Sequence, residues 1–194
     1  MESIQLSSEI LSAEFNHPEK IETLELEHRK IHKIDTHALK DFPNLHTIYL
    51  GFNFLTSFDS RIFQGVNLKR LLLNSNGTNM LNYNFSEYLT NLISLDLSDN
   101  KLLYPCMEIF ENFCHLKSLN LARNKLFSID FNLFYGLKSL TSLSLMNNKL
   151  KMIDPRTISH LTELQELDLS MNELNSLDFT MFENLRKQFR GLIR

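Results

Sequence analysis

Apolar residues recur along this chain in a long, regular repeat. The pattern L-x-x-L-x-L-x-x-N-x-L begins again every 23 or 24 residues, at Ile21, Leu45, Leu68, Leu92, Leu116, Leu140 and Leu164. Its L-x-L segment has the two-residue period of a strand, which sends alternate side chains to opposite faces. A single unit of this length cannot bury its own apolar face, so the pattern predicts a stack of coils that cover one another.

Each coil should add one short strand to a parallel sheet. We predict an α/β repeat solenoid, a horseshoe with the sheet on its concave face and a convex side that is mostly irregular or 3-10 helical. A set of amphipathic helices is the alternative, but a fixed L-x-L-x-x-N pattern does not follow helical spacing. We number positions from the first residue of each repeat. Position 19 is often phenylalanine, which predicts an aromatic stack under the convex side, with Phe63, Phe110, Phe134 and Phe182.

The repeats suggest a division of the chain into three parts. Residues 21–187 hold the seven repeats. Residues 1–20 hold a weak copy, in which Ile4, Leu6 and Leu11 would take positions 4, 6 and 11, so we interpret them as a degenerate N-terminal capping coil. Residues 188–194 begin an incomplete repeat. Because an uncapped end exposes a core layer, we expect a fragment, a truncated gene model or an alternative end, and this end could also support self-association.

Asparagine occupies position 9 in all but the first repeat, where Arg29 stands instead. The chain turns at this position and leaves backbone groups without strand partners. A buried side-chain amide can donate and accept at once, so stacked amides can satisfy the turns of adjacent coils. We therefore predict a structural ladder formed by Asn53, Asn76, Asn100, Asn124, Asn148 and Asn172.

Composition and motifs exclude several functional classes. The net charge of −3 is too small to argue for nucleic acid or an anionic membrane. No segment approaches the ~20 apolar residues of a membrane span, and residues 1–15 lack the features of a secretory signal. We find no catalytic motif and no cofactor-binding motif. We also predict no metal site, because His28 and His32, the one candidate pair of ligands, do not share a helix. Cys106 and Cys114 could form a disulfide or stay buried thiols.

The repeat resembles the typical 24-residue subclass of the leucine-rich-repeat superfamily, over nearly the full length of the chain. That subclass includes Toll-type receptors and insect leucine-rich-repeat immune proteins. The resemblance implies a non-enzymatic module, of immune or adhesion type, that binds a protein or glycoprotein at the cell surface or outside the cell. An intracellular scaffold or adaptor is the alternative. The chain departs from the subclass in lacking a signal peptide and the cysteine clusters that usually cap such arrays.

Members of this fold usually bind partners on the concave sheet, through the outward positions 3, 5 and 8. Most of these positions hold small polar residues here. The exceptions are gathered in one place and combine aromatic side chains with an arginine, as binding hot spots do. We predict a partner-binding cluster of Tyr49, Phe52, Phe54, Arg70 and Leu72. The alternative is that a glycan or a loop covers them.

Two further features concern the surface. Lys101, Lys125 and Lys149 occupy position 10 of successive repeats, as a solvated stripe or as the contact for an anionic partner or glycan. Two glycosylation sequons occur, Asn76-Gly-Thr78 and Asn84-Phe-Ser86. Because Asn76 also belongs to the ladder, we predict that a secreted chain carries a glycan at Asn84 on the convex side and none at Asn76.

Overall fold

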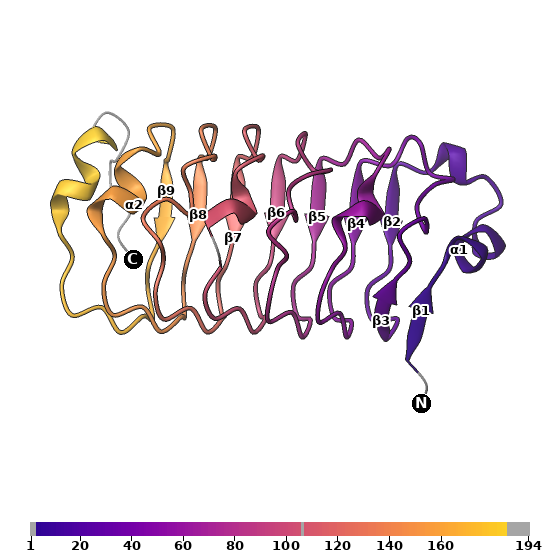
Figure 1. Cartoon of the computed structure of the whole chain (residues 1–194), viewed down its shortest axis with the longest axis horizontal. Coiled ribbons are helices and arrows are strands. Elements are labelled where there is room, and N and C mark those ends of the chain that lie inside the picture. Colours follow the sequence, from indigo (N-terminus) through magenta and orange to yellow (C-terminus); the bar gives the residue numbers. More distant parts are fainter. Residues whose placement is uncertain (1–2, 106, 186–194) are drawn as a thin grey trace.

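A computed structural model describes residues 3–105 and 107–185. Its coils stack side by side along one axis, and each of the seven repeats contributes a strand to the same sheet (Figure 1). Within the described residues this sheet has seven parallel strands in the order β2-β4-β5-β6-β7-β8-β9. They are β2 (Thr23–Glu25), β4 (Thr47–Tyr49), β5 (Arg70–Leu72), β6 (Ser94–Asp96), β7 (Ser118–Asn120), β8 (Ser142–Ser144) and β9 (Glu166–Asp168). The predicted solenoid with a parallel sheet is therefore confirmed.

The strands pair without any shift of register. Position 4 of each repeat pairs with position 4 of the next, from Leu24 opposite Ile48 to Leu143 opposite Leu167. The second repeat is one residue shorter than the others, yet Ile48 still pairs with Leu71. Positions 4 and 6 point inward and are buried in every repeat. The outward positions 3, 5 and 8 consequently form continuous rows along one surface, which we call the sheet face.

Helical structure is confined to short pieces, as predicted. The described α-helices are α1 (Ser8–Glu14) and α2 (Pro155–Ser159). Single turns of 3-10 helix lie at Pro18–Lys20, Ser60–Phe63 and Met107–Phe110, and a longer one at Phe179–Leu185. Asp154 begins α2 by accepting a hydrogen bond from the backbone N–H of Arg156, and Pro155 supplies a fixed φ at the first helical position.

A row of phenylalanines packs beneath the side opposite the sheet. The ring of Phe110 lies 6.0 Å from that of Phe113 and 6.3 Å from that of Phe134. Phe85 continues the row to Phe113 at 6.1 Å and to Phe58 at 6.5 Å. The row thus draws on positions 14, 18 and 22 as well as position 19. Aromatic pairs at these separations add stability beyond the apolar area they bury.

The N-terminal segment corrects one prediction. Strand β1 (Ile4–Leu6) does not extend the seven-stranded sheet but pairs in parallel with β3 (Ile31–Ile34). Ile4 and Leu6 therefore stand at positions 11 and 14, not 4 and 6, and α1 follows them. Leu11, on α1, is fully buried. The sequence did carry a signal for this helix, because Ser7 caps it and Glu9 lies in its first turn.

Candidate binding face

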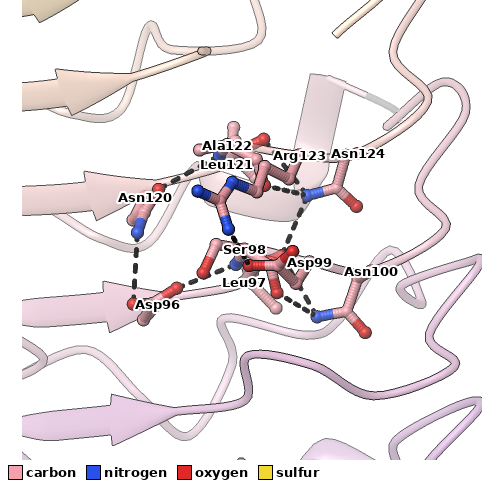
Figure 2. A network of polar contacts seen from close by, with 10 residues as sticks. All are labelled: Asp96, Leu97, Ser98, Asp99, Asn100, Asn120, Leu121, Ala122, Arg123 and Asn124. Atoms are coloured by element: carbon pink, nitrogen blue, oxygen red, sulfur yellow. Dashed lines mark hydrogen bonds and ion pairs between the residues drawn. The ribbon is translucent and has the colours of Figure 1, made fainter. Parts of the chain in front are cut away.

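The asparagines of position 9 tie each coil to the one before it (Figure 2). The side-chain amide of Asn124 donates to the carbonyl oxygens of Leu97, Leu121 and Ala122. Its oxygen accepts from the backbone N–H of Leu102. The same bonds to the preceding coil recur at Asn53, Asn76, Asn100, Asn148 and Asn172. These bonds hold the turn that follows every strand in the same shape, so the sheet face keeps one geometry from coil to coil.

The residue before each asparagine adopts a left-handed backbone conformation. Position 8 has φ between 53° and 58° in every repeat, at His28, Phe52, Ser75, Asp99, Arg123, Asn147 and Met171. Only His28, Asp99 and Asn147 are of the non-glycine types that enter this region most readily. Neighbouring position-8 side chains reach one another: Arg123 lies 3.8 Å from Asp99, and His28 stacks on Phe52. The residue types at position 8 therefore do not by themselves predict this conformation.

In repeats 4, 5 and 7 the polar residues of position 5 are engaged within the chain. Asp96 accepts from the backbone N–H of Ser98 at 2.8 Å, and Asp168 does the same with Ser170 at 2.9 Å. Asn120 accepts from the N–H of Ala122 and donates to Asp96 across the strands at 3.2 Å (Figure 2). These side chains are half-buried rather than fully solvated. Much of the hydrogen-bonding capacity of this half of the sheet face is therefore already in use.

The first three repeats present a different surface. Tyr49 and Leu72 are paired neighbours on β4 and β5, and both are half-exposed at position 5. Phe52 is 48% exposed, and its ring stacks on that of His28 with 4.5 Å between centroids and an 11° interplanar angle. Arg70 is exposed at position 3, beside them. We call His28, Tyr49, Phe52, Arg70 and Leu72 the aromatic cluster.

Gly51, the residue before Phe52, lets two side chains from neighbouring coils approach the backbone. It lies between Leu50 and Phe52, just after β4, and is buried. A side chain there would meet the amide oxygen of Asn74 at 2.6 Å and the carboxylate of Glu27 at 3.0 Å. Glu27 and Asn74 thus converge over the glycine from the two adjacent coils. They add a polar rim that the sequence analysis did not include, and only the equivalence of position 7 in the three repeats could have indicated it.

Phe54 does not belong with the aromatic cluster. Its backbone N–H donates to the carbonyl of Ile31 at 2.8 Å, which is the bond that Lys101, Lys125 and Lys149 make to the preceding coil. Position 10 lies beyond the asparagine ladder, so Phe54 continues the edge that carries the lysines. The ring is 56% exposed there. The other four predicted residues are brought together, and His28 joins them.

The asparagines of the two sequons differ in burial and in hydrogen bonding. The amide of Asn76 is buried and donates to the carbonyls of Leu50, Leu73 and Asn74. Asn84 is half-buried in the turn before Phe85, and no ladder bond engages it. Of the two cysteines, Cys114 is exposed, and Cys106 lies outside the described residues. No helix in the described part of the chain has the length and apolar character of a membrane span.

A comparison with known protein families matches most of the repeat region. The family model for the leucine-rich repeat matches residues 19–77, 90–150, 114–174 and 138–187. A search among curated protein sequences finds no match.

Solved structures match over most of the chain. The chain is similar to the TLR13 protein of the TLR13–ssRNA13 complex, with 28% identity over 94% of this chain and a TM-score of 0.85. It is also similar to the protein LIC12759 of Leptospira interrogans, with 27% identity over 86% of this chain and a TM-score of 0.71. The Drosophila Toll–Spätzle complex shares the fold at 21% identity over 93% of this chain, with a TM-score of 0.73. The chain spans 25%, 41% and 27% of those three chains, respectively.

Proposed function

The chain belongs to the leucine-rich-repeat family, and on that premise we propose that it is an extracellular recognition module of the Toll-related, innate-immune type. Its partner is a protein or glycoprotein, and the contact is made by the aromatic cluster on the sheet face. The repeat scaffold holds this surface rigid, so binding requires little ordering of the protein. Low ordering cost favours affinity at a given contact area.

One observation carries the proposal: the exposed ring of Phe52, held against His28, lies beside the half-exposed Tyr49 and Leu72. Aromatic side chains offer a large contact area at a small entropic cost, and arginine at their edge completes the composition of a hot spot. At position 5, where Tyr49 and Leu72 stand, repeats 4, 5 and 7 hold Asp96, Asn120 and Asp168, which bond within the chain. The contrast favours a localised site over a general property of the surface.

The structural neighbours support recognition as the activity. Toll is solved in complex with Spätzle, and the TLR13 chain in complex with a single-stranded RNA. The small net charge of the present chain favours a protein partner over RNA. RNA is therefore included as a competing ligand in the test below.

Affinity capture from the extracellular fluid of the source organism tests the proposal. One bait is the chain itself, and the other is the triple variant Tyr49→Ser, Phe52→Ser, Leu72→Ser. Serine already stands at position 8 as Ser75 and at position 5 as Ser144, so these replacements suit the local backbone. We expect a protein that the wild-type bait retains and the variant does not. A control bait with Ser142→Ala and Ser144→Ala should retain it.

Three results would count against the proposal. Partners retained equally by both baits would place the contact elsewhere on the surface. A partner found only in cytosolic extract would favour the alternative, an intracellular scaffold. Loss of capture on nuclease treatment, with recovery on adding single-stranded RNA, would mean that the ligand is a nucleic acid.

A further inference from the structure

A second surface of the solenoid combines exposed apolar side chains with unpaired lysines. It lies beyond the asparagine ladder, at positions 10 to 13 of repeats 3 to 6. Its apolar members are Met80, Leu103, Tyr104, Phe127 and Met152, all exposed. Its basic members are Lys101, Lys125, Lys149 and Lys151. We call these nine residues the lysine edge.

The members of the lysine edge are adjacent in space. The backbone N–H of Lys101 donates to the carbonyl of Thr78, that of Lys125 to Leu102, and that of Lys149 to Leu126, at 2.8–2.9 Å. Consecutive coils therefore run side by side through this region. The rings of Tyr104 and Phe127 lie 6.2 Å apart with 30° between their planes. The edge is thus one continuous surface along the axis of the solenoid.

The charge of the lysine edge opposes that of the whole chain. Segments 101–104, 125–128 and 149–152 contain four lysines and no acidic residue, whereas the chain carries a net charge of −3. None of the ion pairs found among the described residues involves any of the four lysines. Their charges are consequently available to an external anionic group, and side by side they create a local positive field.

A small apolar pocket opens in the same surface. It has a volume of about 110 Å³ and is lined mainly by Met80, Leu102, Leu103, Tyr104 and Ile109. A dry cavity of roughly 150 Å³ takes a benzene ring. The smaller pocket therefore suits a single aliphatic side chain. Phe127 and Met152, with 56% and 73% of their surface exposed, extend the apolar surface away from the pocket.

We propose that the lysine edge binds an acidic segment of a partner protein, with one aliphatic side chain seated in the pocket beside Tyr104 and with carboxylates on the lysines. The lysines favour an acidic ligand through charge complementarity. The small apolar pocket favours a ligand that also carries an aliphatic side chain. A lipid surface would need a broad apolar face rather than one small pocket among lysines. Single-stranded RNA would need a row of aromatic faces for successive bases, whereas the lysine edge holds one pair of neighbouring rings, Tyr104 and Phe127. This site is separate from the aromatic cluster and does not depend on it.

Selection from a phage-displayed library of random peptides tests the proposal, with the whole chain as bait. The counter-bait carries Lys125→Glu, Phe127→Asn and Tyr104→Ser, for which Glu173, Asn175 and Ser176 provide precedents at the same positions of repeat 7. We expect enriched peptides rich in Asp and Glu around a Leu, Ile or Met. The strongest peptide, synthesised with a fluorophore, should bind the counter-bait at least roughly tenfold more weakly than wild type.

Matched variants distinguish this site from general effects. Charge reversal at Lys20 and Lys117, two exposed lysines outside the edge, should leave peptide affinity unchanged. The Tyr49→Ser, Phe52→Ser variant should also bind normally. Replacing the aliphatic residue of the peptide with Ser should weaken binding, because the pocket is then empty.

Four outcomes would overturn the proposal. The first is the absence of any acidic enrichment, and the second is equal binding to wild type and counter-bait. The third and fourth are binding of phosphatidylserine vesicles or of an oligouridylate RNA to the edge in preference to the peptide. The circular dichroism spectrum and melting temperature of each variant establish that it is folded.

Discussion

Asn124 donates its side-chain amide to the carbonyl oxygen of Leu97, one repeat earlier, at 2.9 Å. Leu97 lies just beyond β6, and its carbonyl has no partner in the strand ladder at the turn. The asparagine thus supplies the hydrogen-bond donor that the sheet does not provide. The asparagines of five other repeats donate to the equivalent carbonyl. The solenoid is a set of coils joined by side-chain amides as well as by apolar packing.

Removing one rung should destabilise the protein measurably. Asn124→Ala leaves buried groups such as the N–H of Leu102 unpaired, so we expect a loss of about 1–3 kcal/mol in the free energy of unfolding. Asn120→Ala should lose less, because Asn120 is half-buried and makes fewer bonds. The exposed Asn91→Ala serves as the control, with a change within about 0.5 kcal/mol. Equal shifts in urea denaturation for Asn124 and Asn91 would contradict the ladder.

Gly136 should tolerate no side chain. A Cβ there would lie 2.5 Å from the carbonyl oxygen of Glu111 and 2.7 Å from that of Phe110, and both are backbone atoms of the preceding coil. Gly136→Ala should therefore cost about 1–3 kcal/mol of stability. Gly77→Ala is the matched control, because its nearest neighbour is the methyl group of Thr56 at 3.4 Å. Thermal unfolding of both variants makes the comparison, and an equal effect would argue against close packing at Gly136.

The pairing of Asp154 with Arg156 should make stability depend on pH. Hydrogen bonds from the Arg156 side chain and backbone lower the pKa of Asp154 from 3.8 to about 2. A lowered pKa means that the carboxylate stabilises the folded state above about pH 4, and that this contribution disappears as the pH falls toward 2. We expect the stability difference between wild type and Asp154→Asn to shrink over that range. A difference that stays constant from pH 5 to 2 would exclude the linkage.

Glycosylation should distinguish the two sequons. On secretion from insect cells, Asn84 should carry a glycan, because its side chain makes no ladder bond on the outer surface. Asn76 should carry none, since its amide is buried and donates to three carbonyls. Mass spectrometry of the peptides before and after deglycosylation provides the measurement. Occupancy at Asn76 would mean that its coil is not folded as described.

The sequence was sufficient to predict the repeat, because a period-2 strand and a turn asparagine recur at fixed intervals. It was not sufficient at the N-terminus. Ile4 and Leu6 fit the strand of a repeat as well as they fit positions 11 and 14, and only the pairing with β3 decides between them. Alternation also predicted that Tyr49 and Leu72 face outward. The left-handed turn at Phe52 and the displacement of Phe54 depend on the ladder geometry, which no local residue preference indicates.

The affinity of the captured partner for single variants tests the central claim, that the aromatic cluster is the binding site. Phe52→Ala and Tyr49→Ala should each weaken binding by about 1–2 kcal/mol or more in a calorimetric titration, with little change in melting temperature. Ser144→Ala, at the same position as Tyr49 but four repeats further along, should bind like wild type. Normal binding by the Phe52 and Tyr49 variants, together with weakened binding by Ser144→Ala, would place the site elsewhere on the sheet and contradict this account.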